Sequence, residues 1–199
     1  MAGWAGARSR VKLDRVLLLP TASPYRVRPA TRADVSALAR IRNASWRAAY
    51  GGIVPDHELE AMSLARSSRV ISDTLARRRY GSFVMAIERH GRPLGYTLAG
   101  PQPRRDVPFR GEVYELYVDP AAQRRGAGTQ LLTATLWHLS ELGLTPAMLW
   151  VLEQNDARHF YAGCGGRPIA RAPVNVGGRS LRRVAYAWDE FLPLPPTAT

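Results

Sequence analysis

The sequence predicts an α/β domain whose strands and helices follow one another in the order β-α-α-β-β-β-α-β-α-β-β. Two observations lead to this prediction. Short runs rich in Val, Ile, Leu and Tyr, typical of strands, alternate with stretches whose apolar residues recur at helical spacing. In the middle of the chain, a strand-like run from Val113 is followed by a Gly-containing turn and a leucine-rich helix that includes Leu132. The domain extends over about residues 24–190.

The first elements of the domain are one strand and two helical regions. Residues 25–29 alternate in polarity and end in proline, which predicts the first strand. A near capping box at residues 31–34 starts a helix whose apolar face continues to residue 46. The segment 46–55 then breaks this helix, and a second helical region runs from about residue 56 to 79.

The middle of the chain contributes strands and one long connection. Residues 82–88 and 93–99 form two strands, and residues 89–92 are the hairpin loop between them. Residues 100–111, with three prolines and three arginines, have no periodicity and form a longer loop near the active cleft. Residues 147–152 are a continuous apolar run, as expected for a strand buried on both faces.

The last elements are a short helix and two strands. The helix covers residues 156–161 and is closed by the glycine-rich segment 163–166. The strands, residues 169–171 and 179–188, flank a Gly177-Gly178 turn.

The stretch from Val113 to Leu132 has the composition of an anion-binding site. Its strand ends at Asp119-Pro120, and the turn Gln123-Arg124-Arg125-Gly126-Ala127-Gly128 leads directly into a helix. The first turn of a helix has unpaired N–H groups and a partial positive charge, and glycines let a phosphate approach the backbone. A Rossmann fingerprint needs a glycine where Leu131 stands, and a P-loop needs a lysine that the segment lacks. Both of these nucleotide-binding interpretations therefore fail.

The stretch instead resembles motif A of the GNAT acetyltransferase superfamily, Gln/Arg-x-x-Gly-x-Gly/Ala, whose loop holds the pyrophosphate of acetyl-coenzyme A. Residues 149–155, followed by residues 157–161, resemble motif B of the same family. Residues 24–190 are thus similar to a bacterial-type single-domain member. The resemblance implies the GNAT fold, an α/β fold with a mixed, mostly antiparallel seven-stranded sheet, flanked by four helices and splayed between strands 4 and 5.

The resemblance also implies which residues are catalytic. Glu112 stands 14 residues before Gly126 and matches the glutamate that serves as base in the histone-acetyltransferase branch. Glu115 is the alternative base, but its strand parity points it to the other face unless a bulge intervenes. Some relatives take the base from strand five, where this chain has Trp150, which cannot serve. Tyr161 matches the tyrosine that donates a proton to the coenzyme A sulfur.

The cofactor site follows from the same resemblance. The backbone of Leu116, Tyr117 and Val118 is expected to bind the pantetheine arm as an additional strand would. Asn155 is expected to hydrogen-bond the cofactor or to cap its own helix. The pyrophosphate is expected to bind main-chain N–H groups of Arg124, Arg125, Gly126, Ala127, Gly128 and Thr129. Acetyl-CoA is thus the expected co-substrate.

Four further residues near these motifs are interpreted as structural. Trp46, Tyr50 and His57 lie where relatives build one wall of the acceptor site, but core and turn roles are favoured for them. Cys164, the single cysteine, fills a turn and rules out an intrachain disulfide. It is a poor covalent acetyl carrier because it lies beyond the helix that supplies Tyr161.

The composition narrows the choice of partners. The net charge is +12 and Lys12 is the only lysine, but the arginines are spread along the chain, so nucleic acid is not an expected partner. The histidines are scattered, which predicts no metal site. No apolar run approaches the ~18 residues of a membrane span and no secretory signal is recognisable, which predicts a cytoplasmic protein without membrane contact. Residues 1–23 are expected to be a flexible extension and residues 191–199 a Pro-rich tail.

These inferences predict an acetyl-CoA-dependent N-acetyltransferase. The acetyl group would pass directly, in a ternary complex, to a primary amine of a small molecule or of a protein N-terminus. A homodimer is compatible with the resemblance, since related domains often form dimers. The alternatives are a non-catalytic acyl-CoA sensor and an arginine-rich module that binds nucleic acid or the ribosome. The acceptor walls come from loops, which vary freely on one fold.

Overall fold

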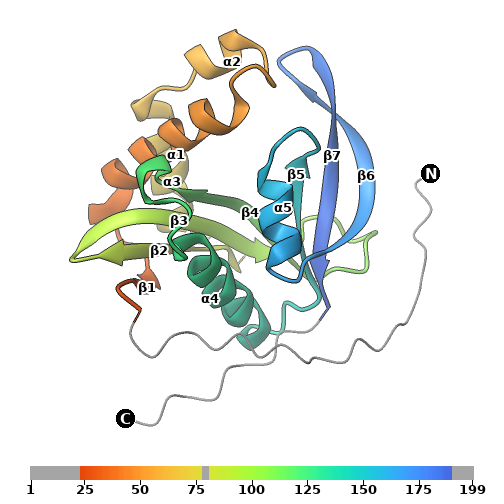
Figure 1. Cartoon of the computed structure of the whole chain (residues 1–199). Coiled ribbons are helices and arrows are strands. Elements are labelled where there is room, and N and C mark those ends of the chain that lie inside the picture. The colour runs from red at the N-terminus through yellow and green to blue at the C-terminus, as the bar shows by residue number, and fades with distance from the viewer. Residues whose placement is uncertain (1–22, 78–80, 190–199) are drawn as a thin grey trace.

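The computed structural model describes residues 23–77 and 81–189, which form one seven-stranded sheet in the order β1-β2-β3-β4-β5-β7-β6 (Figure 1). All neighbouring strands are antiparallel except β4 and β5, which are parallel. The predicted mixed, mostly antiparallel seven-stranded sheet is confirmed. The strands are β1 (Arg26–Pro29), β2 (Phe83–Arg89), β3 (Arg92–Pro101), β4 (Gly111–Val118), β5 (Ala147–Leu152), β6 (Arg167–Val176) and β7 (Arg179–Trp188).

The described residues contain five α-helices, where the sequence predicted four. The second predicted helical region, residues 56–79, is two helices, because Ser63 begins a new one: its hydroxyl oxygen accepts from the Arg66 amide at 3.1 Å. The first helix also continues beyond residue 46 and ends only where Gly51 follows. The helices are α1 (Val35–Tyr50), α2 (Asp56–Glu60), α3 (Leu64–Arg77), α4 (Ala127–Glu141) and α5 (Ala157–Gly163).

The last hairpin is longer than predicted. Strand β6 covers ten residues, whereas the sequence indicated only residues 169–171. Pro168 and Pro173 hid the rest of the strand from the sequence pattern. Both are tolerated because β6 is an edge strand that pairs only with β7, so that a missing N–H costs no ladder hydrogen bond. The predicted extension 1–23 and tail 191–199 lie outside the described residues, apart from Ser23.

Helices cover the sheet from both sides. Helices α4 and α5 pack on one face, where leucines of α4 and Tyr161 of α5 join residues from β4, β5 and β7 in the core. Helices α1 and α3 pack on the other face, over β2, β3 and β4. On that second face, β5 and β7 are covered by the loop that carries Phe109. Figure 1 shows α4 and α5 together in front of the sheet.

Strands β4 and β5 separate almost as soon as they meet. They pair only at Gly111 with Ala147 and at Glu112 with Met148, and beyond Glu112 the edge of β4 has no neighbouring strand. The paired end is tightly packed: a Cβ on Gly111 would lie 2.4 Å from the Leu144 carbonyl oxygen. The predicted splay between strands 4 and 5 is therefore present, and Glu112 stands at its vertex.

A buried hydroxyl pair fixes α4 on β3. Thr97 and Thr135 are fully buried with their Oγ1 atoms 2.7 Å apart, and the Thr135 hydroxyl donates to the Leu131 carbonyl at 2.8 Å. Because a hydroxyl has one hydrogen, Thr97 must be the donor to Thr135. This bond joins the sheet to the helix whose first turn faces the splay.

Replacing each threonine of this pair by valine should lower the free energy of unfolding by different amounts. T135V removes the acceptor of the buried Thr97 hydroxyl and is expected to lower the free energy of unfolding by about 1–3 kcal/mol. T97V leaves Thr135 its bond to Leu131 and should cost less, and the double variant should resemble T97V more than the sum of the two. Urea unfolding of the three variants measures this; additive losses would contradict the coupling of the pair, and a larger loss in T97V than in T135V would contradict the assignment of donor and acceptor.

Candidate active site

Glu112 is half-buried at the vertex of the splay, on the face of the sheet opposite α4 and α5. Burial raises the pKa of its carboxyl above the ordinary value. A hydrogen bond with the Gln102 side chain and the positive charge of Arg183 oppose this rise. Among the described residues, Glu112 has no ion-pair partner within 4.0 Å. The site thus holds a carboxyl that can exchange a proton closer to neutral pH.

Glu115 lies on the same face as Glu112, because the bulge that the sequence allowed as the exception to strand parity is present. Strand β4 has a bulge: Val113 pairs with Ala99 and Glu115 with Leu98, so Tyr114 is the extra residue. The Glu115 carboxylate is already occupied. It accepts from Arg42 Nη2 at 3.1 Å and from the Tyr96 hydroxyl at 2.6 Å.

The open edge of β4 presents main-chain groups of Leu116 and Val118. The Asp119 amide donates to Leu94 of β3, and adjacent residues of a strand point to opposite sides, so Tyr117 also bonds β3 while Leu116 and Val118 point away from it. The Val118 carbonyl accepts from Ser45 Oγ and Gln123 Nε2, both at 3.0 Å. Three main-chain groups at this edge have no partner strand and could pair with an extended ligand: the Leu116 N–H, the Leu116 C=O and the Val118 N–H. Tyr117 contributes its side chain, whose hydroxyl accepts from the Trp46 indole at 2.7 Å.

The turn before α4 has the conformation expected of an anion loop. Arg124 (φ 59°) and Gly126 (φ 84°) are both left-handed, and Gly126 immediately precedes the first helical residue, Ala127. Gly128 allows α5 to approach, because a Cβ there would lie 3.3 Å from the Phe160 ring. The first amides of α4 therefore point along the helix axis out of its N-terminus, beside the open edge of β4.

Helix α5 brings Asn155, Tyr161 and Tyr50 together. The Asn155 side-chain oxygen accepts from the Ala157 amide at 2.9 Å, so it caps its own helix, one of the two predicted roles. Its side chain also hydrogen-bonds the Tyr50 hydroxyl at the end of α1. Tyr161 is 8% exposed, and burial, with the nearby Tyr50 and Cys164, raises the pKa of its hydroxyl, which stays protonated at neutral pH. Tyr50, interpreted from sequence as structural, lies beside both motif residues.

Cys164 ends α5 as a half-buried residue, with Sγ 3.9 Å from the Thr129 hydroxyl oxygen. Burial raises the pKa of its thiol. A protonated thiol is a weak nucleophile, which agrees with the predicted structural role.

The two halves of the sheet are connected above the splay. Arg179 of β7 donates to the Ile53 carbonyl, in the α1–α2 connection, at 2.9 Å. At the tip of the β6–β7 hairpin, Gly177 lies against α2: a Cβ there would be 2.6 Å from Glu58 and 2.8 Å from His57. Figure 1 shows this hairpin and α2 at the same end of the molecule. His57 thus lies at this connection. Trp46 contacts β4 instead, through its hydrogen bond to the Tyr117 hydroxyl.

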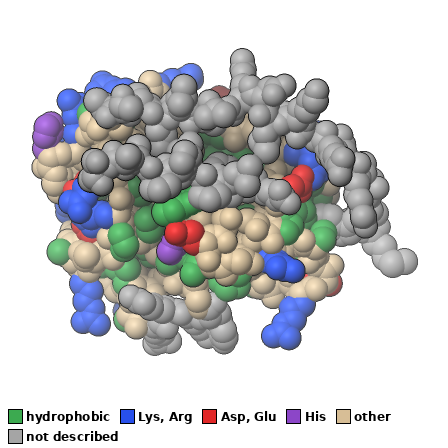
Figure 2. Space-filling model, turned by 90° about the horizontal axis from the view of Figure 1, so that it is seen from below, with side chains coloured by type: hydrophobic (Ala, Val, Ile, Leu, Met, Phe, Trp, Pro, Cys, Tyr) green, Lys and Arg blue, Asp and Glu red, His purple; other side chains and the backbone are tan. Residues whose placement is uncertain are grey.

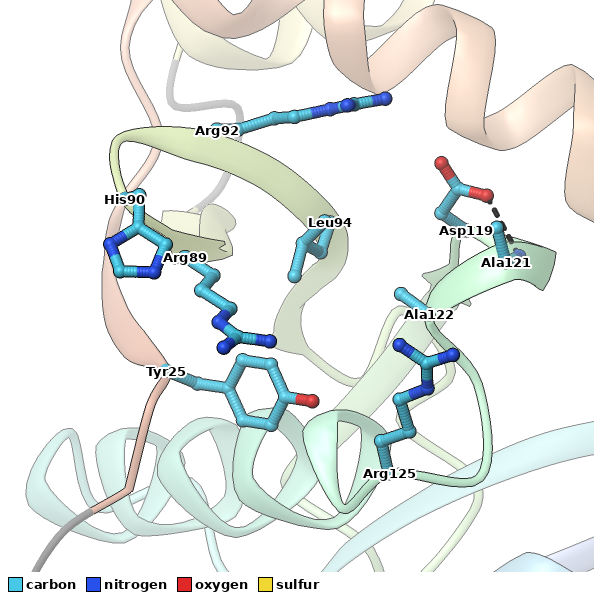
Figure 3. Close-up of a pocket in the computed structure, with 9 residues that line it drawn as sticks. All are labelled: Tyr25, Arg89, His90, Arg92, Leu94, Asp119, Ala121, Ala122 and Arg125. Carbon is cyan, nitrogen blue, oxygen red and sulfur yellow. Dashed lines mark hydrogen bonds between the residues drawn. The ribbon is translucent and has the colours of Figure 1, made fainter.

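A basic depression of about 520 Å³ lies on the other side of the anion loop. Figure 3 shows Arg89 and Tyr25 pointing into it from one side and Arg125 from the other. None of Arg89, Arg92 and Arg125 forms an ion pair with a described residue. The loop therefore carries positive charge on the side away from the splay as well.

Other features of the described residues bear on the remaining predictions. They contain no group of three or more His, Cys, Asp or Glu that could hold a metal ion. A search of the same residues finds no helix with the length and apolar character of a membrane span. On the face shown in Figure 2, the described basic side chains lie at separate places rather than in one patch.

The fold and the loop define a class of protein. The sequence model of the Acetyltransferase (GNAT) family matches residues 38–165, and the chain belongs to this family of acetyltransferases. The N-acetyltransferase YuaI of Bacillus subtilis is 27% identical over 165 residues, 83% of this chain and 93% of the relative. The predicted family is confirmed.

Solved structures share the fold. The acetyltransferase yncA of Salmonella typhimurium, with its cofactor acetyl-CoA, matches with a TM-score of 0.66 and 23% identity over 88% of this chain and 100% of that one. The PaiA N-acetyltransferase of Thermoplasma acidophilum, in complex with coenzyme A, matches with a TM-score of 0.63 and 15% identity over 82% of this chain and 99% of that one.

Sequence reasoning missed three residues on the Glu112 face: Gln102, Arg183 and the role of Trp150. Gln102 comes from an aperiodic loop. Arg183 follows Arg182, and two adjacent arginines give no signal as to which one faces the site. Trp150 was excluded as a base, but its ring supports the Arg183 guanidinium, with Cζ 4.2 Å from the ring centroid.

Replacement of Glu112 by Gln tests the burial of this carboxyl without any ligand. Because its folded pKa is raised, the stability that the protonated form contributes is complete below the ordinary Glu value of ~4.3 and is lost as the pH rises through the folded pKa. We expect E112Q to match the wild-type Tm at about pH 4 and to exceed it at about pH 8. Thermal melts across this range measure the difference, with the exposed E60Q as control. A difference that does not change with pH would contradict the burial argument.

Proposed function

We propose that the protein is an acetyl-CoA-dependent N-acetyltransferase that transfers the acetyl group directly to an amine in a ternary complex. One observation carries this proposal: the open edge of β4 and the N-terminus of α4 adjoin each other at the splay. An extended chain with an amide backbone can pair with that edge while its diphosphate receives the helix amides. Pantetheine and pyrophosphate stand in this order in coenzyme A.

The cofactor is held mainly by main-chain groups. Leu116 and the Val118 amide pair with the pantetheine arm, and the amides around Gly126 bind the pyrophosphate. Arg124 and Arg125 are exposed at the same loop and add positive charge that attracts the polyanionic coenzyme. Coenzyme A complexes of structures with this fold support the choice of ligand.

Glu112 serves as the general base. An alkyl ammonium has a pKa of ~10.4, so transfer at neutral pH requires a group that removes its proton. Glu112 has a raised pKa and no ion-pair partner among the described residues, whereas Glu115 is bound by Arg42 and Tyr96. The free carboxyl is the better proton acceptor.

Tyr161 donates a proton to the departing thiolate. It lies on the α5 face of the sheet and Glu112 on the opposite face, so the thioester would be approached from both sides of the splay. A tyrosine with a raised pKa is protonated before transfer and can supply the proton when negative charge develops on sulfur. Cys164, with its protonated thiol, is not needed as a covalent carrier.

Removal of the two loop arginines should weaken cofactor binding. The double variant R124Q/R125Q is expected to bind acetyl-CoA roughly 10-fold less tightly at low salt, and the loss should shrink as salt screens the charges. Titration calorimetry measures both affinities. The variant R40Q/R69Q removes the same charge from exposed sites on α1 and α3 and serves as control. Equal affinities for the two double variants would argue against the loop.

The catalytic roles can be tested by thiol release with acetyl-CoA and a panel of amines. E112Q is expected to lower kcat roughly 100-fold and Y161F roughly 10-fold, with acetyl-CoA affinity retained. In the wild type, the rate should rise with pH through the raised pKa of Glu112, and E112Q should lack this rise. Y186F, in the same core cluster as Tyr161, is the control. Unchanged rates in both variants would remove these assignments, and cofactor binding without any turnover would indicate a sensor.

A further inference from the structure

Arg183 lies on the same face of the sheet as Glu112. Trp150 packs with Met148 on the face opposite α5, and Met148 is the strand partner of Glu112. Arg183 is two residues from Ala185, the partner of Trp150, and strand alternation therefore places Arg183 on this face too. Glu112 belongs to β4, on one side of the splay, whereas Trp150 of β5 and Arg183 of β7 lie on the other side.

The Arg183 guanidinium is held in place but not neutralised. Its Cζ lies over the Trp150 ring, 4.2 Å from the centroid, so the ring supports the guanidinium. Its Nε is buried and has no hydrogen-bond partner among the described residues, and no carboxylate of theirs lies within 4.0 Å of the side chain. The side chain as a whole is only half-buried, so an anionic ligand could supply the counter-charge that the described residues do not.

Glu112 is the opposite charge that acts on Arg183. Each of the two side chains shifts the pKa of the other, yet they do not form an ion pair within 4.0 Å. Arg104 also acts on Arg183, but its own charge is paired with Asp106 at 2.5 Å. A carboxylate and a guanidinium, neither of them in an ion pair with a described residue, thus lie on one face of the sheet. A zwitterion complements this arrangement.

We propose that Arg183 binds a carboxylate of the acceptor, and that the acceptor is a free amino acid or a similar small zwitterion rather than a protein N-terminus. The ammonium group faces Glu112, which removes its proton, and the carboxylate meets the planar fork of Arg183. This rests on the proposed function. A peptide N-terminus carries a neutral amide in place of the carboxylate and leaves the guanidinium without a counter-charge.

The connection above the splay favours a small acceptor as well. The hydrogen bond from Arg179 to Ile53 and the contact of Gly177 with Glu58 join the β6–β7 hairpin to the α1–α2 connection. The two sides of the splay are therefore in contact at the end away from its vertex. A protein N-terminus would have to pass its chain beneath this connection, whereas a free amino acid has no chain to accommodate.

The kinetic test compares the twenty common amino acids with their C-terminal amides. In the wild type, kcat/KM should be higher for the acid than for the amide of the preferred residue, and this ratio should fall roughly 10- to 100-fold in R183Q. The difference in amine pKa between acids and amides affects both enzymes equally, so it does not contribute to the change of the ratio from wild type to R183Q. R183K keeps the charge without the fork and should recover only part of the ratio. R182Q is the matched control, because Arg182 is exposed and pairs with Glu153 at 3.2 Å.

A binding test separates this proposal from the proposed function. N-acetyl amino acids keep the carboxylate but have no amine to deprotonate, so their binding requires no turnover. Calorimetry, with and without coenzyme A, should show tighter binding of the N-acetyl acid than of its amide to the wild type and to R182Q, but not to R183Q. Equal binding of acid and amide by the wild type, or a preference that persists in R183Q, would overturn the proposal. Absence of turnover with retained carboxylate preference would overturn only the enzyme assignment.

Discussion

The structure depends on the early separation of β4 and β5. Two parallel pairs hold the strands together, and after Glu112 the edge of β4 continues without a partner strand. Free main-chain donors and acceptors inside a folded protein are costly unless something pairs with them. Ser45 and Gln123 satisfy one such group, the Val118 carbonyl. The remaining groups at Leu116 and Val118 are free to pair with an additional strand, and in the proposed function this incomplete sheet receives the pantetheine arm.

The second requirement is that α4 begins at the end of that open edge. A short turn at Asp119 and a left-handed turn at Gly126 bring the chain from β4 into α4 within a few residues. The buried Thr97–Thr135 bond then fixes the helix against β3. The open edge offers directional pairing, and the helix terminus offers partial positive charge. Because one chain segment supplies both, their relative position is set locally and does not rely on distant loops.

The sequence predicts the parts of the site whose contacts join neighbouring residues. It misses those that depend on how the strands pair in the sheet. The anion loop could be recognised because Gly126 and the leucines of α4 are adjacent in sequence, and Asn155 as a cap because its partner is two residues away. The face of Glu115 depended on whether a bulge intervenes in β4, and the sequence left this open because the bulge at Tyr114 arises from the register with β3. The extent of β6 was hidden by its prolines, which only an edge position permits.

The two carboxylates of β4 illustrate how environment divides roles on one surface. Glu112 and Glu115 share a strand and a face, and the bulge brings both there. Glu115 receives a guanidinium and a phenol, which hold it as a fixed charge that braces α1 against the sheet. Glu112 is half-buried, with a hydrogen bond to the Gln102 side chain, and burial raises the pKa of its carboxyl. A base needs this incomplete solvation, and the nearby Arg183 supplies the opposite charge at a distance that avoids neutralising it.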